Sequence, residues 1–242
     1  IGEYTSVLGT DAAWNANATL ACEKLNGLIL KSGDTFSFND LLGLLTSDKG
    51  YQPALAYRGR VATSIMGGGV THTASVLYNC VLEAELEILE RHNHIYAPDF
   101  IEVGRDVYVN NGTADFRFRN NRPDPIRIKA EVVDGTIQIT IEGTDSRDYI
   151  VEVSVQIVET FQPEILFTTM TADNPGGYKE GDVLSNGTNG YEVEIHCWLY
   201  NKQDGLLENE KLVSTYSYEA QDSVVVKIQT ATPDPDIPLE TP

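Results

Sequence analysis

Residues 67–91, GGGVTHTASVLYNCVLEAELEILER, decide the fold predicted for this chain. Three glycines lead into Thr71 and His72, and the long apolar segment after them predicts a helix from Thr73 to about Arg91. Apolar residues cover more than one face of this helix, so we expect it to be mostly buried. Its solvent side is marked by three acidic residues: Glu83, Glu87 and Glu90.

The chain before this segment predicts a second helix and a short strand. Residues 11–26, DAAWNANATLACEKLN, place apolar residues at helical spacing behind Asp11, which can cap the helix. Residues 35–38, TFSF, alternate between polar and apolar positions, which is typical of a strand with Phe36 and Phe38 on one face.

After His94 the helical period disappears. Short alternating runs separated by Asn-Gly and Asp-Gly predict antiparallel hairpins, and from Ser146 onward only strands and turns are indicated. Helices followed by meandering strands indicate an α+β domain with a buried helix and an antiparallel sheet. We therefore predict three segments: an α+β domain at 1–145, a smaller, extended all-β module at 146–230 and a Pro-rich tail or linker at 231–242.

Composition and charge exclude several classes of partner. With 36 acidic and 17 basic residues the formal net charge is -19, so we expect no nucleic acid as a partner. No run approaches the roughly eighteen apolar residues of a membrane helix, so we expect a soluble chain whose native signal or anchor, if present, lies outside it. Three widely spaced cysteines in apolar contexts predict no disulfide framework.

The glycine run before the helix has two interpretations. Gly67, Gly68 and Gly69 would leave backbone N–H groups open at the positive end of the helix dipole, where an anion or oxyanion binds. The same glycines suit a tight turn at which another backbone passes close. Thr71 and Thr73 are both good N-caps, which is a sufficient structural role for either.

Three of the four histidines lie near this helix. His72 is at its start, whereas His92 and His94 follow its end, about 28 Å away for a helix of that length. If the chain after Arg91 turns back, His72, His94 and Asp106 converge, and imidazole and carboxylate groups suit zinc. A histidine at a helix end more often caps carbonyls or lies half exposed, so we predict no metal and no cofactor.

Several ordered motifs between residue 1 and about residue 143 resemble the VanW-like family. They are GDTFSFNDLLG, the Gly50–Tyr51 pair, GGGVTHTASVLYNCVLEAELEILERHNH and VGRDVYVNNGTADFRFRNN. This family occurs in cell-envelope proteins of Gram-positive bacteria and is named for an accessory product of vancomycin-resistance clusters. The resemblance implies an extracellular or wall-associated protein, and it assigns no reaction.

The second module is similar to the G-five domain of wall-associated proteins, both in GGYKEGDVLSNGTNGYEVEI and in the tyrosine-rich strand that follows. That resemblance implies binding of wall glycans, for which aromatic rings on an extended sheet are suited. Alternate aromatic residues must belong to the core. The candidates for sugar contact are Tyr191, Trp198, Tyr200, Tyr216 and Tyr218.

The chain departs from the family at the glycine run. Relatives read Cys-Gln where this chain has Thr71 and His72. In the relatives the pattern implies a thiolate activated at a helix start, with a histidine and an aspartate at the positions of His94 and Asp106. A threonine hydroxyl is far less acidic and needs a strong neighbouring base. Arg91 also matches a family position, for which the helix dipole is a sufficient explanation.

Three interpretations of the site follow. In the first, a degenerate nucleophile site binds or remodels peptidoglycan or an attached peptide, with the glycine amides and His94 as polar contacts. In the second, an active amidase or transferase uses Thr71 with His72 or His94 as base, or His72 and Asp106 through water or a metal. In the third, these residues serve only the fold. We favour the first, because the frame is kept while the expected nucleophile is lost.

Overall fold

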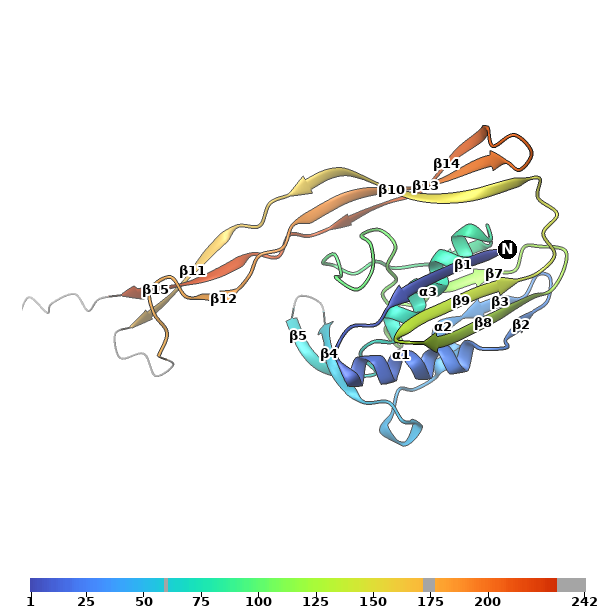
Figure 1. Ribbon diagram of the computed structural model, residues 1–242. Helices are drawn as coiled ribbons and strands as arrows, with labels where there is room; N and C mark the ends of the chain where they lie inside the picture. Colours follow the sequence, from blue (N-terminus) through green and yellow to red (C-terminus); the bar gives the residue numbers. More distant parts are fainter. Residues whose placement is uncertain (59–60, 172–176, 230–242) are drawn as a thin grey trace, which may run out of the picture.

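The chain forms a mixed body of helices and strands, from which a long arm of strands extends (Figure 1). This computed structural model describes residues 1–58, 61–171 and 177–229. The body is α+β with antiparallel sheets and the arm is all-β, which confirms the predicted fold class. The tail predicted at 231–242 lies outside the described residues.

Helix α3 (Val70–Glu83) is the central element of the body and is buried along almost its whole length, as predicted. It packs on helix α1 (Ala12–Leu25) and on one face of a four-stranded antiparallel sheet. The strand order in that sheet is β1 (Gly2–Val7), β9 (Thr136–Glu142), β8 (Ile126–Val133) and β2 (Ile29–Leu30). Isoleucines of β8 and β9 complete the core beneath the helix.

Helix α1 begins and ends as its sequence predicts. The Asp11 carboxylate accepts a hydrogen bond from the Trp14 N–H at 2.9 Å, which satisfies one of the free donors of the first turn. Ala18, Ala21 and Leu25 are fully buried at helical spacing. The prediction of a helix at 11–26 is therefore confirmed to within one residue at each end.

The predicted helix from Thr73 to Arg91 is wrong at its C-terminal end. Helix α3 stops at Glu83, Glu85 has a φ of +51°, and β6 (Glu87–Glu90) follows as a strand. This strand pairs with β7 (Arg117–Arg119), which in turn pairs with β3 (Thr35–Ser37). The apolar residues after Glu83 fit both the helical and the strand periodicity. They form a strand because they pair with β7, which lies about thirty residues further along the chain and so gives no local signal.

The predicted strand at 35–38 also ends early. Phe38 starts the short helix α2 (Phe38–Leu42), whose first turn is capped when Ser37 Oγ accepts from the Asp40 N–H at 3.1 Å. Both Phe36 and Phe38 are buried, although on different elements. A 3-10 turn, η1 (Ser47–Lys49), leads to the antiparallel hairpin of β4 (Pro53–Arg58) and β5 (Val61–Met66).

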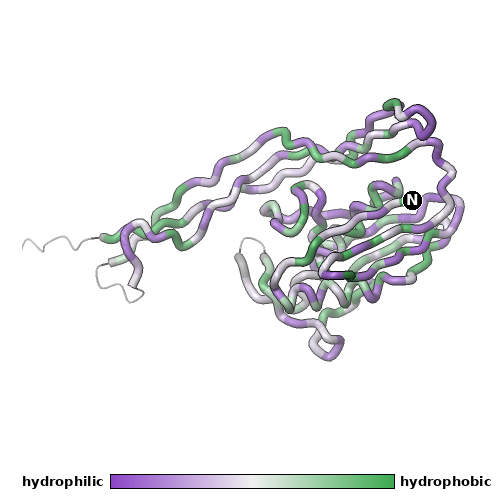
Figure 2. The backbone as a smooth tube through the Cα atoms, viewed as in Figure 1, coloured by the Kyte–Doolittle hydropathy of each residue, from purple (hydrophilic) through white to green (hydrophobic). Residues whose placement is uncertain are grey.

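The arm is a ribbon of two consecutive three-stranded sheets (Figure 1). Near the body the order is β10 (Tyr149–Phe161), β13 (Gly190–Asn201) and β14 (Leu207–Tyr218), all antiparallel. Further out the order is β11 (Ile165–Thr171), β15 (Ser223–Gln229) and β12 (Val183–Ser185), where β11 and β15 run parallel. Apolar residues continue to the outer part of the ribbon (Figure 2), and Ile165, Leu166 and Phe167 are exposed there.

The inner end of the arm packs on the body. Ile195 of β13 is fully buried within the same apolar cluster as α3, and Val153, Val155 and Tyr216 pack against that cluster. Arg105 of the body donates to the Val153 carbonyl at 2.5 Å. The inner sheet of the arm therefore shares the core of the body. No helix among the described residues is long and apolar enough to cross a membrane.

Candidate functional site

The glycine run in front of α3 does not leave its first amides open. Gly67 and Gly68 are buried, and their N–H groups donate to the carbonyls of Gln52 at 3.0 Å and Ile65 at 3.2 Å. The prediction of an anion site built from these amides is therefore wrong for Gly67 and Gly68, because both donors are already bound to backbone carbonyls, one just before β4 and one within β5.

Close approach of other backbone explains why glycines stand here. A Cβ atom added to Gly69, whose φ is +112°, would lie 2.4 Å from the Trp14 carbonyl oxygen of α1. Gly69 itself is the N-cap of α3, without a side-chain cap. Neither Thr71 nor Thr73 is the N-cap that we predicted; Thr73 Oγ1 instead donates to the Ala18 carbonyl at 2.9 Å. The alternative interpretation, a turn at which a second backbone passes close, is confirmed.

His72, in the first turn of α3, is fully buried and bound to Ser6 of β1. Its Nε2 lies 2.7 Å from Ser6 Oγ, which also lies 3.2 Å from the Phe100 carbonyl. Ser6 has a single hydroxyl proton, which it donates to the Phe100 carbonyl. In the contact with His72 the Ser6 oxygen is then the acceptor, and His72 Nε2–H is the donor. Nδ1 then carries a lone pair that is buried without a hydrogen-bond partner among the described residues. Burial lowers the pKa of His72 to about 4 and outweighs the negative charge of Asp99, which acts in the opposite direction.

This burial predicts a loss of stability in mild acid. The pKa of His72 is about 4 in the folded chain and about 6.5 when unfolded, so protons bind preferentially to the unfolded state as the pH falls between these values. Between pH 7.5 and 4.5 this linkage removes roughly 2.5 kcal/mol from the free energy of unfolding. Urea denaturation of the wild type and His72→Gln at several pH values measures it. The wild type should lose more stability than His72→Gln over this range, and identical pH slopes would contradict the assignment.

His94 and Asp106, two of the predicted site residues, form a direct pair. Asp106 is fully buried, and its Oδ2 accepts hydrogen bonds from His94 Nδ1 at 2.6 Å and from the His94 N–H at 2.8 Å. Burial alone would raise the pKa of Asp106, but the bonds from His94 and the charge of Arg91 outweigh it, so the net pKa is lowered. Asp106 therefore stays ionised and fixes the ring of His94, whose side chain is 16% exposed.

Arg91 supports this pair and does not cap a helix. It follows strand β6, so our assignment of Arg91 to a helix dipole is wrong. Its Nε donates to the Asp106 carbonyl at 2.9 Å and its Nη2 to Asp106 Oδ1 at 3.2 Å. The guanidinium is held between two rings, 3.7 Å from the centre of Tyr216 and 5.0 Å from that of Tyr78.

Phe100 joins the start of α3 to the His94–Asp106 pair. The ring centre of Phe100 lies 4.8 Å from that of His72 and 5.8 Å from that of His94. The chain after Arg91 thus turns back to the helix start. Within the residues described, no hydrogen bond links the Thr71 hydroxyl to either histidine. No group of three or more His, Cys, Asp or Glu residues in the same ranges is arranged to hold a metal ion.

The aromatic residues predicted to bind sugar divide into two sets. Tyr218 is fully buried and the ring of Tyr216 lies against Arg91, so neither is available for stacking on a glycan. Trp198, Tyr191 and Tyr200 are partly exposed on β13. Trp198 Nε1 donates to Ser154 Oγ at 2.7 Å, and this bond to β10 orients the indole.

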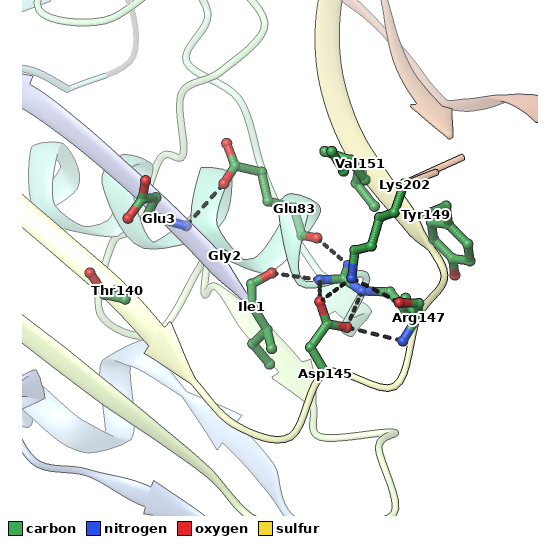
Figure 3. A pocket seen from close by; sticks show the side chains of 11 residues that line it. Ile1, Gly2, Glu3, Glu83, Thr140, Asp145, Arg147, Tyr149, Val151 and Lys202 are labelled. Carbon is green, nitrogen blue, oxygen red and sulfur yellow. Dashed lines mark hydrogen bonds and ion pairs between the residues drawn. The ribbon is translucent and has the colours of Figure 1, made fainter. Parts of the chain in front are cut away.

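A hollow of about 260 Å³ lies where the arm leaves the body (Figure 3). Arg147 dominates it, donating to the Glu83 carbonyl at 2.7 Å, the Ile1 carbonyl at 3.0 Å and Asp145 Oδ1 at 2.7 Å. Lys202 of the arm donates to the other oxygen of Asp145 at 3.2 Å. Arg147 holds the pKa of Asp145 far below its ordinary range.

This charged cluster was missed in the sequence, where TDSRDY gave only a signal of alternating charges at the junction. The donors of Arg147 are taken up by main-chain carbonyls at the end of α3 and by Asp145. A second hollow of about 520 Å³, lined among others by Arg122 and Lys211, adjoins it through Arg147. Because these charges pair with one another and with backbone carbonyls, we interpret the cluster as a structural link between body and arm.

Part of this chain is similar to a known protein family and to known proteins. Residues 14–142 match the protein family described as VanW like protein. Uncharacterized protein YoaR of Bacillus subtilis (strain 168) is 31% identical over 147 residues, which cover 60% of this chain and 48% of that protein. Vancomycin B-type resistance protein VanW of Enterococcus faecalis (strain ATCC 700802 / V583) is 32% identical over 110 residues, 43% of this chain and 40% of that protein. The matches thus span less than half the length of these relatives.

Two solved G5 domains are also similar to part of this chain. The crystal structure of HP0197-G5 is 17% identical, with a TM-score of 0.17, and covers 34% of this chain and 99% of its own. The IgA1 protease G5 domain is 17% identical, with a TM-score of 0.21, and covers 36% of this chain and 99% of its own. The family match is the decisive one, because residues 14–142 are more than half of the 242 residues and include most of α1, all of α3 and the His94–Asp106 pair. This chain belongs to the VanW-like family.

Proposed function

We propose that this chain is part of an extracellular or wall-associated protein that binds peptidoglycan or an attached peptide. We favour binding without catalysis because the Thr71 hydroxyl has no base bound to it in the part of the chain that the structure describes. Its hydroxyl has no hydrogen bond to His72 or His94 among the described residues, and His72 Nε2 is already bound to Ser6 at 2.7 Å. A threonine hydroxyl without a base is a weak nucleophile, but it remains a good polar contact for a ligand.

An active amidase or transferase is the second candidate. It is favoured by the bond of 2.6 Å from His94 Nδ1 to Asp106, because a carboxylate that orients an imidazole is the usual support of a general base. In that reaction His94 would take the Thr71 proton as the hydroxyl oxygen attacks an amide carbonyl, and would return it to the leaving amine. Catalytic hydrogen bonds often tighten only when substrate is bound, so the two candidates need an experiment to separate them.

Retention on purified peptidoglycan tests both candidates. The whole chain is used, because body and arm share one core. We expect the wild type to sediment with peptidoglycan and to release no fragments detectable by mass spectrometry, and we expect His94→Gln to be retained several-fold less. Release of fragments that disappears in both Thr71→Ala and His94→Gln would favour the enzyme. If the wild type is not retained and no fragments are released, the wall-ligand proposal is contradicted.

Thr71→Cys tests whether this position still belongs to a nucleophile site. The three native cysteines are buried, with Cys22 at 1%, Cys80 at 0% and Cys197 at 4% exposure, and burial raises the pKa of Cys22 to about 11. Iodoacetamide should therefore label the folded Thr71→Cys variant once and the wild type not at all. A helix start and a nearby imidazole lower the pKa of a thiol. We expect adding His94→Gln to slow labelling at pH 7 about tenfold, the effect of one pKa unit.

Thr10→Cys is the control for this labelling, because Thr10 is exposed and lies outside any helix. Its rate should not respond to His94→Gln. Equal rates for Thr71→Cys with and without His94 would show that the imidazole does not serve position 71, and the degenerate-nucleophile interpretation would then fail.

A further inference from the structure

Tyr218, the last residue of β14 in the arm, reaches into the body as far as Asp106. It is fully buried, and its hydroxyl lies 2.5 Å from Asp106 Oδ1, although the two residues are 112 positions apart. The Gly104 N–H donates to the same hydroxyl at 3.0 Å. Since an N–H group can only donate, the Tyr218 oxygen accepts from Gly104 and directs its own proton to Asp106.

The Asp106 carboxylate is saturated by four donors. Oδ1 accepts from Tyr218 and from Arg91 Nη2, and Oδ2 accepts from the backbone N–H and Nδ1 of His94. A carboxylate offers about four lone-pair positions, so each is occupied. Rotation of the carboxylate would break these bonds together. The donors on Oδ1 therefore determine that Oδ2 faces the ring of His94.

Both donors on Oδ1 depend on the arm. Tyr216 and Tyr218 lie two residues apart on one strand and so point to the same face. Tyr216 covers the Arg91 guanidinium at 3.7 Å while Tyr218 binds Asp106 directly. The loop that carries Asp106 is pressed onto the neighbouring strand, since a Cβ atom on Gly104 would lie 2.7 Å from Ile195 Cδ1.

The charges keep these roles fixed over a wide pH range. Burial, and then the negative charge of Asp106, raise the pKa of Tyr218 far above its ordinary value. The net pKa of Asp106 is lowered, because its hydrogen bonds and the charge of Arg91 outweigh its burial. The phenol therefore remains a neutral donor and the carboxylate an ionised acceptor.

We propose that the inner end of the arm completes the site of the body, with Tyr218 as a positioning residue that sets the orientation of His94 through Asp106. This rests on the proposed function only in taking His94 as the polar group that meets the ligand. The arm is then part of the site, and displacement of β14 changes the orientation of the His94 ring.

Nuclear magnetic resonance on the whole chain tests this role without any ligand. We expect a downfield resonance for the His94 Nδ1–H proton, as is usual for an imidazole bound to a buried carboxylate. In Tyr218→Phe this resonance should shift and exchange faster with water, because Oδ2 is no longer held toward the ring by the bond on Oδ1. Tyr149→Phe is the matched control, since the Tyr149 hydroxyl also joins the arm to a body carboxylate, donating to Glu85 at 2.8 Å. It should leave the His94 resonance unchanged.

The result that overturns the proposal is a folded Tyr218→Phe protein with the wild-type His94 resonance. If Tyr218→Phe does not fold, the proposal is tested on the wild-type spectrum alone. The Tyr218 hydroxyl proton should then exchange slowly and show a nuclear Overhauser effect to the Gly104 N–H, and absence of that proton overturns the proposal. A response of His94 to Tyr218→Phe in a chain that peptidoglycan does not retain would remove the proposed function and leave the positioning role standing.

Discussion

Replacing Asp106 with alanine is expected to lower the free energy of unfolding by about 3–5 kcal/mol. The change removes a fully buried carboxylate and leaves the Arg91 guanidinium, whose side chain is 2% exposed, without its counter-charge. His94 Nδ1 and the Tyr218 hydroxyl lose their acceptor in the same step. An uncompensated buried cation costs far more than a lost surface ion pair. Urea denaturation at pH 7.5 provides the measurement.

Three further variants, Glu131→Ala, Arg91→Met and the double variant, separate the buried charge from a general effect of losing a carboxylate. Glu131→Ala removes an exposed carboxylate from β8 and should change stability by less than about 0.5 kcal/mol. Asp106→Ala combined with Arg91→Met removes both charges, so the double variant should be less destabilised than the sum of the single variants. Additive losses would mean that Arg91 and Asp106 do not interact in the folded chain.

Gly69→Ala is expected to destabilise the chain by about 3 kcal/mol. The new Cβ atom would meet the Trp14 carbonyl oxygen at 2.4 Å, in a backbone conformation with φ of +112°. Relief requires α1 and α3 to separate where Gly69 meets Trp14, which disturbs the core and the first turn that carries His72. Thermal or urea unfolding monitored by circular dichroism measures the loss.

Gly9→Ala is the control for this substitution. No atom lies within 4 Å of a Cβ built on Gly9, and its φ is not positive. We expect its stability to stay within about 0.5 kcal/mol of the wild type. If Gly69→Ala were as stable as Gly9→Ala, the close packing of α1 on α3 could not explain the glycine run.

The fold could be predicted where short-range signals agree. Asp11 and the spacing of apolar residues behind it mark α1 to within one residue, and the strict alternation after Ser146 indicates the strands of the arm. The end of α3 could not be predicted in this way. Ile88 and Leu89 fit a helix as well as a strand, and only the pairing of β6 with β7 makes this segment a strand.

The candidate site could be predicted in part for the same reason. His94 and Asp106 could be predicted because they stand at positions that match a histidine and an aspartate of the family motifs, and the structure brings them into contact at 2.6 Å. The partner of Asp106 from the arm was misread as a sugar contact, since Tyr218 sits in an alternating strand whose inward face depends on how the arm docks. The glycine run was misread because the obstructing backbone, at Trp14, is distant in sequence.

The parallel pairing of β11 with β15 also has a mechanical consequence. The two strands run side by side from Ile165 and Ser223 to Thr171 and Gln229, along the direction in which the ribbon leaves the body (Figure 1). A pull on Gln229 along this axis loads the evenly spaced ladder in shear, so its hydrogen bonds share the force instead of opening one after another. The same force passes along the chain from β15 to Tyr218 at the end of β14, and so reaches the Tyr218–Asp106 contact. Tension on the ribbon would therefore act on the carboxylate that orients His94.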